Sequence, residues 1–371
     1  MSSQNALIRK TVTLTLTQAC NLDCIYCYEN HKSTQMMSLE TAKRIVDDEL
    51  LVEDGYEEVE FDLFGGEPFL NFELIKEITD YIIHYDTNKK IVIFIVTNGT
   101  LVHGDVQTWL LQNKQYVVCG LSLDGTKEMT DINRSNCFDS IDLDFFKNTY
   151  PFQTVKMTVS PETLPMLADG VIYLHEVGFI PSANLAYNID WSNQDNVSIL
   201  ERELMKLIDY YLSHPDIEAT SLLDTDISQA YDSKNIMVPY CGAGKSMRSY
   251  DVDGEGYPCQ FFMPLSVGLE KAKVAQKMSF HVDYIPESLW DKKCKDCVIK
   301  SLCPTCLGAN YASSGNMFYH EDNYCKLTKI TMLARSYFKA KRLECGQLNL
   351  SEQEKAKLAK SILLIQENLR I

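Results

Sequence analysis

The stretch that decides the fold is TQACNLDCIYCY at residues 17–28, in which Cys20, Cys24 and Cys27 follow a C-x3-C-x2-C spacing. It comes directly after residues 11–17, TVTLTLT, whose apolar and polar alternation predicts a strand. Three thiolates this close in sequence can hold three irons of a [4Fe–4S] cubane and leave the fourth iron open. A zinc site is the alternative, although zinc usually takes four ligands in paired C-x2-C knuckles and this stretch offers three.

Beyond this stretch, strand-like and helix-like patterns alternate along the first half of the chain. Strands are expected at residues 11–17, 59–64, 91–96, 116–123, 153–159 and 183–189, with helices at 38–52, 71–85, 105–113, 139–148 and 164–177 between them. Such alternation predicts parallel strands joined by crossover helices, and residues 11–189 are too few for a full eight-fold barrel. We therefore expect an α/β fold with a partial (β/α)6 barrel whose functional residues gather at the carboxyl ends of the strands.

The charge balance and the cysteine usage limit the class of protein. The 371 residues include 35 Lys and Arg against 51 Asp and Glu, which gives a formal charge of −16. Such a surface repels a polyanionic backbone on average, so we expect a peptide rather than nucleic acid as substrate.

The sequence has neither an apolar run long enough to span a membrane nor a signal-peptide pattern, so we expect a cytoplasmic protein without membrane contact. In a reducing compartment, 13 cysteines favour metal ligation over disulfides.

Small and polar residues stand where the predicted strands end. The second strand is followed by Gly65-Gly66-Glu67-Pro68: the glycines let the backbone approach a ligand closely, the glutamate offers an acceptor and the proline stiffens the exit. The third and fourth strands end in polar side chains that can bind hydroxyl and carboxylate groups: Thr97, Asn98, Ser122 and Asp124. The alternative is that these are ordinary turns, since Asn-Gly and Asp-Gly are common turn formers.

Together these motifs resemble the radical S-adenosylmethionine (SAM) enzymes. Tyr26 stands at that family's aromatic position before the third cysteine, and Arg134 matches the arginine of its HDxxR segment, in which Thr130 replaces the histidine here. The resemblance implies that Cys20, Cys24 and Cys27 bind a [4Fe–4S] cluster whose open iron takes SAM. It also implies a set of SAM contacts: Tyr26, Gly65, Gly66, Glu67, Pro68, Thr97, Asn98, Ser122, Asp124 and Arg134.

Seven further cysteines lie between residues 241 and 325. Cys241, Gly254 and Cys259 form a C-x12-G-x4-C pattern, and a C-x2-C-x5-C-x2-C run with a distant last cysteine follows: Cys294, Cys297, Cys303, Cys306 and Cys325. This resembles the SPASM extension of radical SAM enzymes, with one spacer shorter by a residue. The resemblance implies one auxiliary [4Fe–4S] cluster on Cys294, Cys297, Cys303 and Cys325, a second on Cys241, Cys259 and Cys306, and hence three clusters in all. Two zinc ribbons are the competing interpretation.

The resemblance also suggests an activity. SPASM proteins modify peptides, and Gln260 stands where sulfatase maturases place a catalytic aspartate after the second auxiliary cysteine, so a sulfatase maturase is disfavoured. We expect a peptide maturase that cleaves SAM to a 5′-deoxyadenosyl radical and installs a cross-link in a ribosomally made precursor peptide. The sequence identifies no catalytic base. A radical SAM enzyme acting on a small-molecule cofactor precursor and a non-catalytic zinc protein are the alternatives.

The expected partners and domains follow from this assignment. The cluster needs an electron donor such as flavodoxin or ferredoxin. Only residues 1–10 precede the first predicted strand, so recognition of the peptide's leader is expected to use a separate protein, the barrel surface or the helical tail. The domains are expected to be a barrel at 1–195, a helical connection at 196–239, a SPASM domain at 240–330 and a helical tail at 331–371.

Overall fold

The computed structural model describes residues 9–232, 241–280 and 285–370. Contacts divide the chain into two compact units that interleave along the sequence. The first holds residues up to 122, residues 134–155 and residues 241–280. The second holds residues 123–133, 156–240 and 281–371. Each unit is described by itself below.

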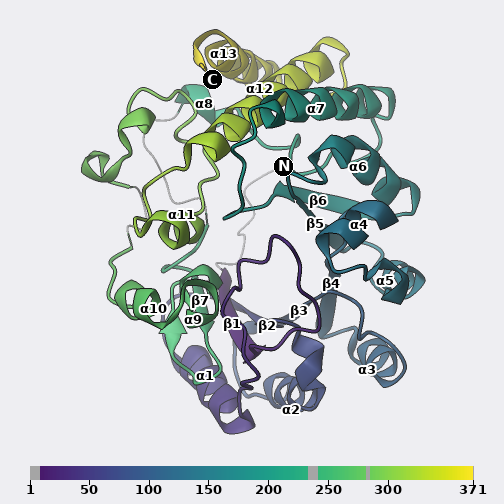
Figure 1. Cartoon of the computed structure of the whole chain (residues 1–371), viewed down its shortest axis with the longest axis vertical. Coiled ribbons are helices and arrows are strands. Elements are labelled where there is room, and N and C mark those ends of the chain that lie inside the picture. Colours follow the sequence, from purple (N-terminus) through teal and green to yellow (C-terminus); the bar gives the residue numbers. More distant parts are fainter. Residues whose placement is uncertain (1–8, 233–240, 281–284, 371) are drawn as a thin grey trace. The chain divides into compact units, whose positions relative to one another are not determined.

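The first unit contains a six-stranded sheet in the order β4-β3-β2-β1-β7-β8 (Figure 1). The strands are β1 (Arg9–Thr17), β2 (Glu58–Gly65), β3 (Lys90–Thr97), β4 (Val117–Leu121), β7 (Met247–Tyr250) and β8 (Gly256–Tyr257). All neighbours pair in parallel except β7 and β8, which are antiparallel. Since β1 lies between β2 and β7, the segment after Cys241 extends the sheet that begins at the N-terminal strand.

Helices cover one face of this sheet. The helices α1 (Leu39–Leu51), α2 (Phe72–Ile83) and α3 (Asp105–Asn113) lie on one side of β1 to β4 in Figure 1. The strand residues on that face are fully or almost fully buried: Val12, Leu14, Leu16, Val59, Phe61, Leu63, Ile93 and Ile95. Alternate strand residues therefore form the core with the helices, and the residues between them point to the opposite face. The shorter helices of this unit are α5 (Leu143–Thr149), α9 (Pro264–Val267) and α10 (Leu269–Ala275).

The second unit pairs a two-stranded sheet with helices. Its strands are β5 (Thr154–Val159), of which the first two residues belong to the first unit, and β6 (Ile180–Leu185). The helices are α4 (Lys127–Asn133), α6 (Leu167–Glu176), α7 (Asp195–Ser213), α8 (Gln229–Asp232), α11 (Leu307–Ser314), α12 (Asp322–Glu344) and α13 (Glu352–Asn368). The long helix α12 packs against both α7 and α13, and one apolar cluster joins α12, α13 and the cysteine-rich segment through Met332, Ile365 and Ile299.

The predicted fold class is confirmed: strands and helices alternate through β6, the main sheet is largely parallel, and helices follow the cysteine-rich region. The strands β7 and β8 were not predicted, because four-residue and two-residue strands carry too few alternations to be recognised. The short helices α4, α9, α10 and α11 were not predicted either. The predicted domain boundaries stay predictions, and the one at 239/240 touches residues outside the described ranges. Within the described residues, no helix is both long enough and apolar enough to cross a membrane.

Candidate functional site

The cysteine loop leaves the carboxyl end of β1 and returns to it. The backbone N–H of Gln18 donates to the carbonyl of Gln35 at 3.0 Å, and that of Met37 donates to Leu16 at 3.0 Å, so the loop is closed at its base. The Gln18 side chain donates to both carboxylate oxygens of Asp251, at 2.8 and 3.0 Å, directly after β7. The loop is therefore tied to the sheet by hydrogen bonds that need no metal.

The three thiols of this loop are partly exposed. The pKa of the Lys32 ammonium is raised overall. Burial lowers this pKa, but the charges of the thiols of Cys27, Cys20 and Cys24 raise it by more. The same ammonium donates to the carbonyl of Leu22 at 3.2 Å. One cation thus stands within electrostatic reach of all three predicted ligands, where it can offset part of the charge of their thiolates.

The two glycines after β2 allow this loop to lie directly on the sheet edge. A Cβ at Gly65 would lie 2.4 Å from the carbonyl oxygen of Thr17, and one at Gly66 would lie 2.4 Å from that of Ala19. Because both are glycine, the N–H of Gly66 donates to Thr17 at 3.1 Å and that of Glu67 donates to Ala19 at 2.9 Å. The sequence predicted a close approach to a ligand at this motif; the close approach observed is to the cysteine loop itself.

Glu67 is buried beneath the loop and is held by three donors. Its carboxylate accepts from the Thr97 hydroxyl at 2.8 Å, from the Asn98 N–H at 2.9 Å and from the Phe69 N–H at 3.3 Å. Burial raises its pKa to about 7, although these hydrogen bonds and the nearby Arg134 charge lower it. The predicted acceptor therefore sits in a fixed orientation, between the end of β3 and the cysteine loop.

The end of β3 also reaches the cysteine loop through side chains. The Asn98 amide donates to Asn21 at 2.9 Å, and Asn21 donates to the Thr100 hydroxyl at 2.8 Å. The N–H of Ser122, after β4, donates to the carbonyl of Thr97 at 3.0 Å. Asn21 and Thr100 were not predicted as site residues, since nothing in their local sequence separates them from turn residues.

Arg134 closes the other side of the loop. Its guanidinium lies 5.5 Å from the centre of the Tyr26 ring, and the neighbouring Ser135 hydroxyl accepts from the Asp23 N–H at 3.0 Å. Arg134 is 6% exposed, which makes it a buried residue rather than a surface arginine. The geometry brings together Tyr26, Glu67, Thr97, Asn98 and Arg134 from four parts of the first unit.

Asp124 belongs to the second unit. It is fully buried, and its carboxylate accepts from the Thr158 N–H at 2.8 Å and from the Asn133 amide at 3.2 Å. These bonds stabilise the turn between β4 and α4 against β5. A SAM contact by Asp124 stays a prediction.

Four of the later cysteines gather in the second unit. Burial raises the pKa of the Cys294 thiol to about 12, and the charges of Asp291, Cys297 and Cys325 add to the rise. Burial also raises the pKa of Cys303, followed by the charges of Cys325, Cys297 and Cys294. The four thiols predicted to share the outer auxiliary cluster therefore stand within electrostatic reach of one another.

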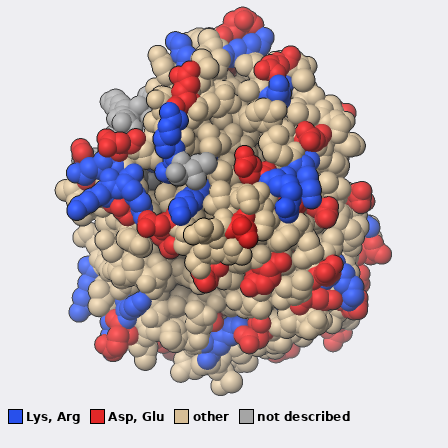
Figure 2. Space-filling model, turned by 45° about the horizontal axis from the view of Figure 1, so that its top comes forward, with Lys and Arg blue, Asp and Glu red and all other residues tan. Residues whose placement is uncertain are grey.

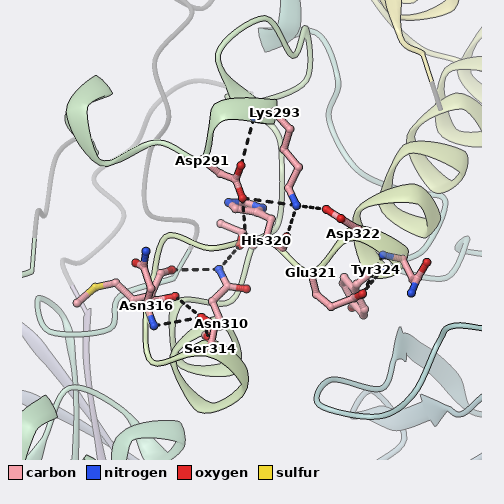
Figure 3. A network of polar contacts seen from close by, with 12 residues as sticks. Asp291, Lys293, Asn310, Ser314, Asn316, His320, Glu321, Asp322 and Tyr324 are labelled. Carbon is pink, nitrogen blue, oxygen red and sulfur yellow. Dashed lines mark hydrogen bonds and ion pairs between the residues drawn. The ribbon is translucent and has the colours of Figure 1, made fainter.

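Polar contacts hold this segment together, as Figure 3 shows. The Lys293 ammonium forms an ion pair with Asp322 at the start of α12, and it donates to the carbonyl of His320. The N–H of His320 in turn donates to Asp291 at 3.3 Å. These contacts connect the turn that carries Cys294 to the helix that carries Cys325.

The remaining auxiliary cysteines are divided between the units. Cys241 is exposed and Cys259 is buried; their segments lie side by side, because the Gly244 N–H donates to the Pro258 carbonyl at 3.1 Å. Cys306 caps α11 in the second unit, with its sulfur accepting from the Ala309 N–H at 3.4 Å. Their shared ligation of an inner cluster stays a prediction.

Among residues 9–232, 241–280 and 285–370, no group of three or more His, Cys, Asp or Glu side chains is placed to hold a metal ion. The binding of clusters by these thiols, like the competing binding of zinc, stays a prediction.

Comparison with known proteins identifies the domain to which this site belongs. Residues 14–141 match the Radical SAM superfamily. The chain contains a radical SAM domain. The domain implies SAM and a [4Fe–4S] cluster as cofactors, and the cysteine-rich region after residue 241 fits a SPASM domain.

Two relatives extend the comparison beyond this domain. An uncharacterized protein of Methanocaldococcus jannaschii is 34% identical over 177 residues, which are 46% of this chain and 59% of that protein. The radical SAM cyclopropyl synthase TigE of Paramaledivibacter caminithermalis is 22% identical over 358 residues, 86% of this chain and 72% of TigE. The chain thus spans less than two thirds of the first of these relatives.

Solved structures share the fold over almost the whole chain. The structure of anSMEcpe with bound AdoMet and Kp18Cys peptide has a TM-score of 0.68 at 20% identity, and covers 92% of this chain and 100% of its own. SuiB of Streptococcus suis bound to the precursor peptide SuiA has a TM-score of 0.52 at 13% identity, and covers 86% of this chain and 76% of its own. At these identities the likeness establishes a common fold.

Proposed function

We propose that this chain is a radical SAM peptide maturase. Cys20, Cys24 and Cys27 hold the SAM-binding [4Fe–4S] cluster, and two SPASM clusters are auxiliary. When bound, the SAM cluster supplies the electron that cleaves SAM into methionine and a 5′-deoxyadenosyl radical, which takes a hydrogen atom from the substrate. The observation that carries the proposal is the cysteine loop, which is hydrogen-bonded onto the GGEP turn beside Glu67.

The residues around this loop have separate tasks. Glu67 presents a carboxylate that three protein donors hold in one orientation, so it can accept from the SAM ammonium without rearranging. Arg134 covers the Tyr26 ring and can neutralise a carboxylate near Glu67. Lys32 offsets thiolate charge on the loop. Because the loop is closed by backbone bonds to β1, it can bind the cluster without first having to fold around it.

A peptide substrate is supported by charge and by the fold. The net charge of −16 disfavours nucleic acid, and on the face shown in Figure 2 the Lys and Arg side chains stand in separate groups among Asp and Glu. Two proteins of the same fold have been solved with peptides bound. A relative that matches 86% of this chain is a cyclopropyl synthase, so we infer an oxidative carbon–carbon bond within the peptide as the cross-link.

This reaction sets further requirements. An electron donor such as flavodoxin or ferredoxin must reduce the SAM cluster, and a separate protein can recognise the leader of the precursor peptide. Cytoplasmic location suits clusters that need free thiols. The substrate of a sulfatase maturase remains disfavoured, because Gln260 after Cys259 cannot take a proton at neutral pH.

Replacing Cys20, Cys24 and Cys27 together by Ala tests the proposal. We expect loss of 5′-deoxyadenosine formation, measured by chromatography after anaerobic reconstitution with SAM and dithionite, because the SAM-cluster ligands are gone. The control is Cys345→Ala, which changes an exposed cysteine outside every motif and should leave the product unchanged. Persistence of 5′-deoxyadenosine in the triple variant would contradict the assignment, and about two or three zinc ions per chain in place of iron would favour the zinc protein.

A further inference from the structure

The face of the six-stranded sheet opposite α1, α2 and α3 carries a row of mostly polar residues that runs across neighbouring strands. In the register of the strands, Thr13 on β1 lies beside Asp62 on β2 and beside Ser249 on β7, and Asp62 lies beside Phe94 on β3. Paired residues of neighbouring strands point to the same face, so these side chains form one row. The buried apolar residues of the same strands occupy the other face.

Two side chains of this row lack the hydrogen bonds that burial demands. The Oδ1 atom of Asp62 and the hydroxyl of Ser249 are both shielded from solvent, and neither has a hydrogen-bond partner in the protein. Ser249 is fully buried, whereas Asp62 as a whole residue is partly exposed and can be reached. A carboxylate oxygen that is buried without a hydrogen-bond partner is destabilising, and carboxylates with perturbed pKa values concentrate at functional sites.

The carboxylate of Asp62 lies within electrostatic reach of the cysteine loop. Burial raises the pKa of the Tyr28 phenol well above its ordinary value, and four charges add to the rise, in the order Glu29, Cys27, Cys259 and Asp62. Tyr28 directly follows Cys27 in the chain. Asp62 therefore acts electrostatically on the residue next to a predicted ligand of the SAM cluster.

An aromatic pair forms the boundary of this neighbourhood. The ring of Tyr28 stacks on that of Phe261, with 4.0 Å between centroids and 21° between planes. Phe261 stands two residues after Cys259, next to Gln260. The position that would carry an acid in a sulfatase maturase is thus occupied by an amide, while the Asp62 carboxylate from β2 is within electrostatic reach of Tyr28.

The proposed reaction requires a base. A peptide that becomes lighter by two hydrogens loses one as an atom to the 5′-deoxyadenosyl radical. The second leaves as a proton: one electron of its C–H bond pairs with the substrate radical in the new carbon–carbon bond, and the other reduces an oxidised auxiliary [4Fe–4S] cluster, which would serve as the one-electron oxidant. We propose that Asp62 is the base that takes this proton from the substrate.

The groups that face Asp62 support this role. Glu60, on the same strand and the same face, is paired with Arg9 and adds a negative charge. Burial, and then the charge of Glu60, raise the pKa of Asp62 to about 7, which suits proton transfer near neutral pH. Across the neighbouring strands Asp62 pairs with Thr13 and Phe94, which do not titrate, and the pKa of the Tyr28 phenol from the cysteine loop is raised well above this range.

Other carboxylates of the first unit are less suited. Glu67 is held by three donors, and Glu29 is 5% exposed, so a substrate group reaches it less easily than Asp62. Asp251 already accepts from Gln18.

The experiment compares Asp62→Asn with Glu60→Gln, a matched change two residues away on the same strand and face. Both are reconstituted anaerobically with SAM, dithionite and the short peptide encoded beside the gene. For Asp62→Asn we expect 5′-deoxyadenosine within about two-fold of the parent enzyme, but about 100-fold less of the peptide product that is lighter by two hydrogens. Glu60→Gln should retain the product, and the rise of its rate with pH should move to lower pH, because a charge that raises the pKa of Asp62 is gone. Asp62→Glu should restore measurable product.

A second measurement does not depend on turnover. Asp62 holds its proton up to about pH 7 in the folded protein and up to about pH 4 when unfolded, so its stabilising protonation is complete below pH 4 and is lost as the pH rises to about 7. Asn mimics the protonated form at every pH. The midpoint of thermal unfolding of Asp62→Asn should therefore exceed that of the parent by several degrees at pH 8, and by about nothing at pH 4.

The outcomes separate this inference from the function on which it rests. If the parent enzyme cleaves SAM but leaves the peptide unchanged, the proposed function fails, and the role of Asp62 falls with it. If the parent modifies the peptide and Asp62→Asn does so at the same rate and with the same pH profile, only the role of Asp62 is overturned. Loss of 5′-deoxyadenosine together with product in Asp62→Asn would assign Asp62 to folding or SAM binding, and would also overturn the inference.

Discussion

The two cysteine-rich regions of this chain are held together in different ways. The loop at residues 18–36 is anchored at both ends to β1, and it lies on the GGEP turn through backbone bonds from Gly66 and Glu67. The segment at 285–325 is built from short turns, two 3₁₀ helices and α11, and Lys293 connects its start to α12. The first site is therefore shaped by the sheet, whereas the second depends more on local polar contacts and, under the proposed function, on bound iron.

Removal of iron should give the largest difference between the two regions. Because metal ligation substitutes for a hydrophobic core in cysteine-rich segments, chelation should speed amide hydrogen exchange across residues 285–325 by orders of magnitude. The amides of β1 to β3 should stay protected, since the parallel ladder does not involve the thiols. Hydrogen-exchange mass spectrometry before and after anaerobic chelation measures this. Equal loss of protection in both regions would show that the first region depends on iron as much as the second.

A glycine substitution tests the anchoring of the first site. Gly66→Ala places a Cβ 2.4 Å from the Ala19 carbonyl, so the cysteine loop must move. We expect a loss of about 3 kcal/mol in the free energy of unfolding, measured by denaturant titration, and less iron bound by the SAM site. The control Gly55→Ala meets no atom within 4 Å and should cost only its positive-φ strain, about 1 kcal/mol. Equal effects of both variants would argue against close contact between the loop and the turn.

These regions also show what the sequence could predict. The strands β1 to β3 were predicted nearly to their bounds, because a repeating apolar pattern depends only on neighbours in the chain. The motif positions Glu67, Thr97 and Asn98 were predicted from their place after strands, and they do lie together. The pairing of β7 with β1 and the bond from Gln18 to Asp251 join residues more than 200 apart, and no local pattern signals such contacts. Asp62 was missed for the same reason, since its lack of partners is a property of the folded sheet.

The smallest expected effect concerns the polar network of the second region. Lys293→Met removes the ion pair with Asp322 and the bond to His320 while keeping the aliphatic stem. We expect a loss of about 1 kcal/mol in the free energy of unfolding, because the lysine is largely covered but not fully buried. Lys341→Met breaks an exposed pair with Glu344 on α12 and should cause no measurable change. An unchanged Lys293→Met would mean that this network adds nothing to the order of the segment.

The central claim is that the loop at residues 20–27 provides a cluster with an open iron for SAM. The most direct test is the electron paramagnetic resonance spectrum of the anaerobically purified, dithionite-reduced protein, recorded before and after addition of SAM. We expect reduced [4Fe–4S] signals, one of which changes shape with SAM and is absent when Cys20, Cys24 and Cys27 are replaced by Ala. A colourless protein without such signals, or signals that SAM leaves unaltered, would contradict it.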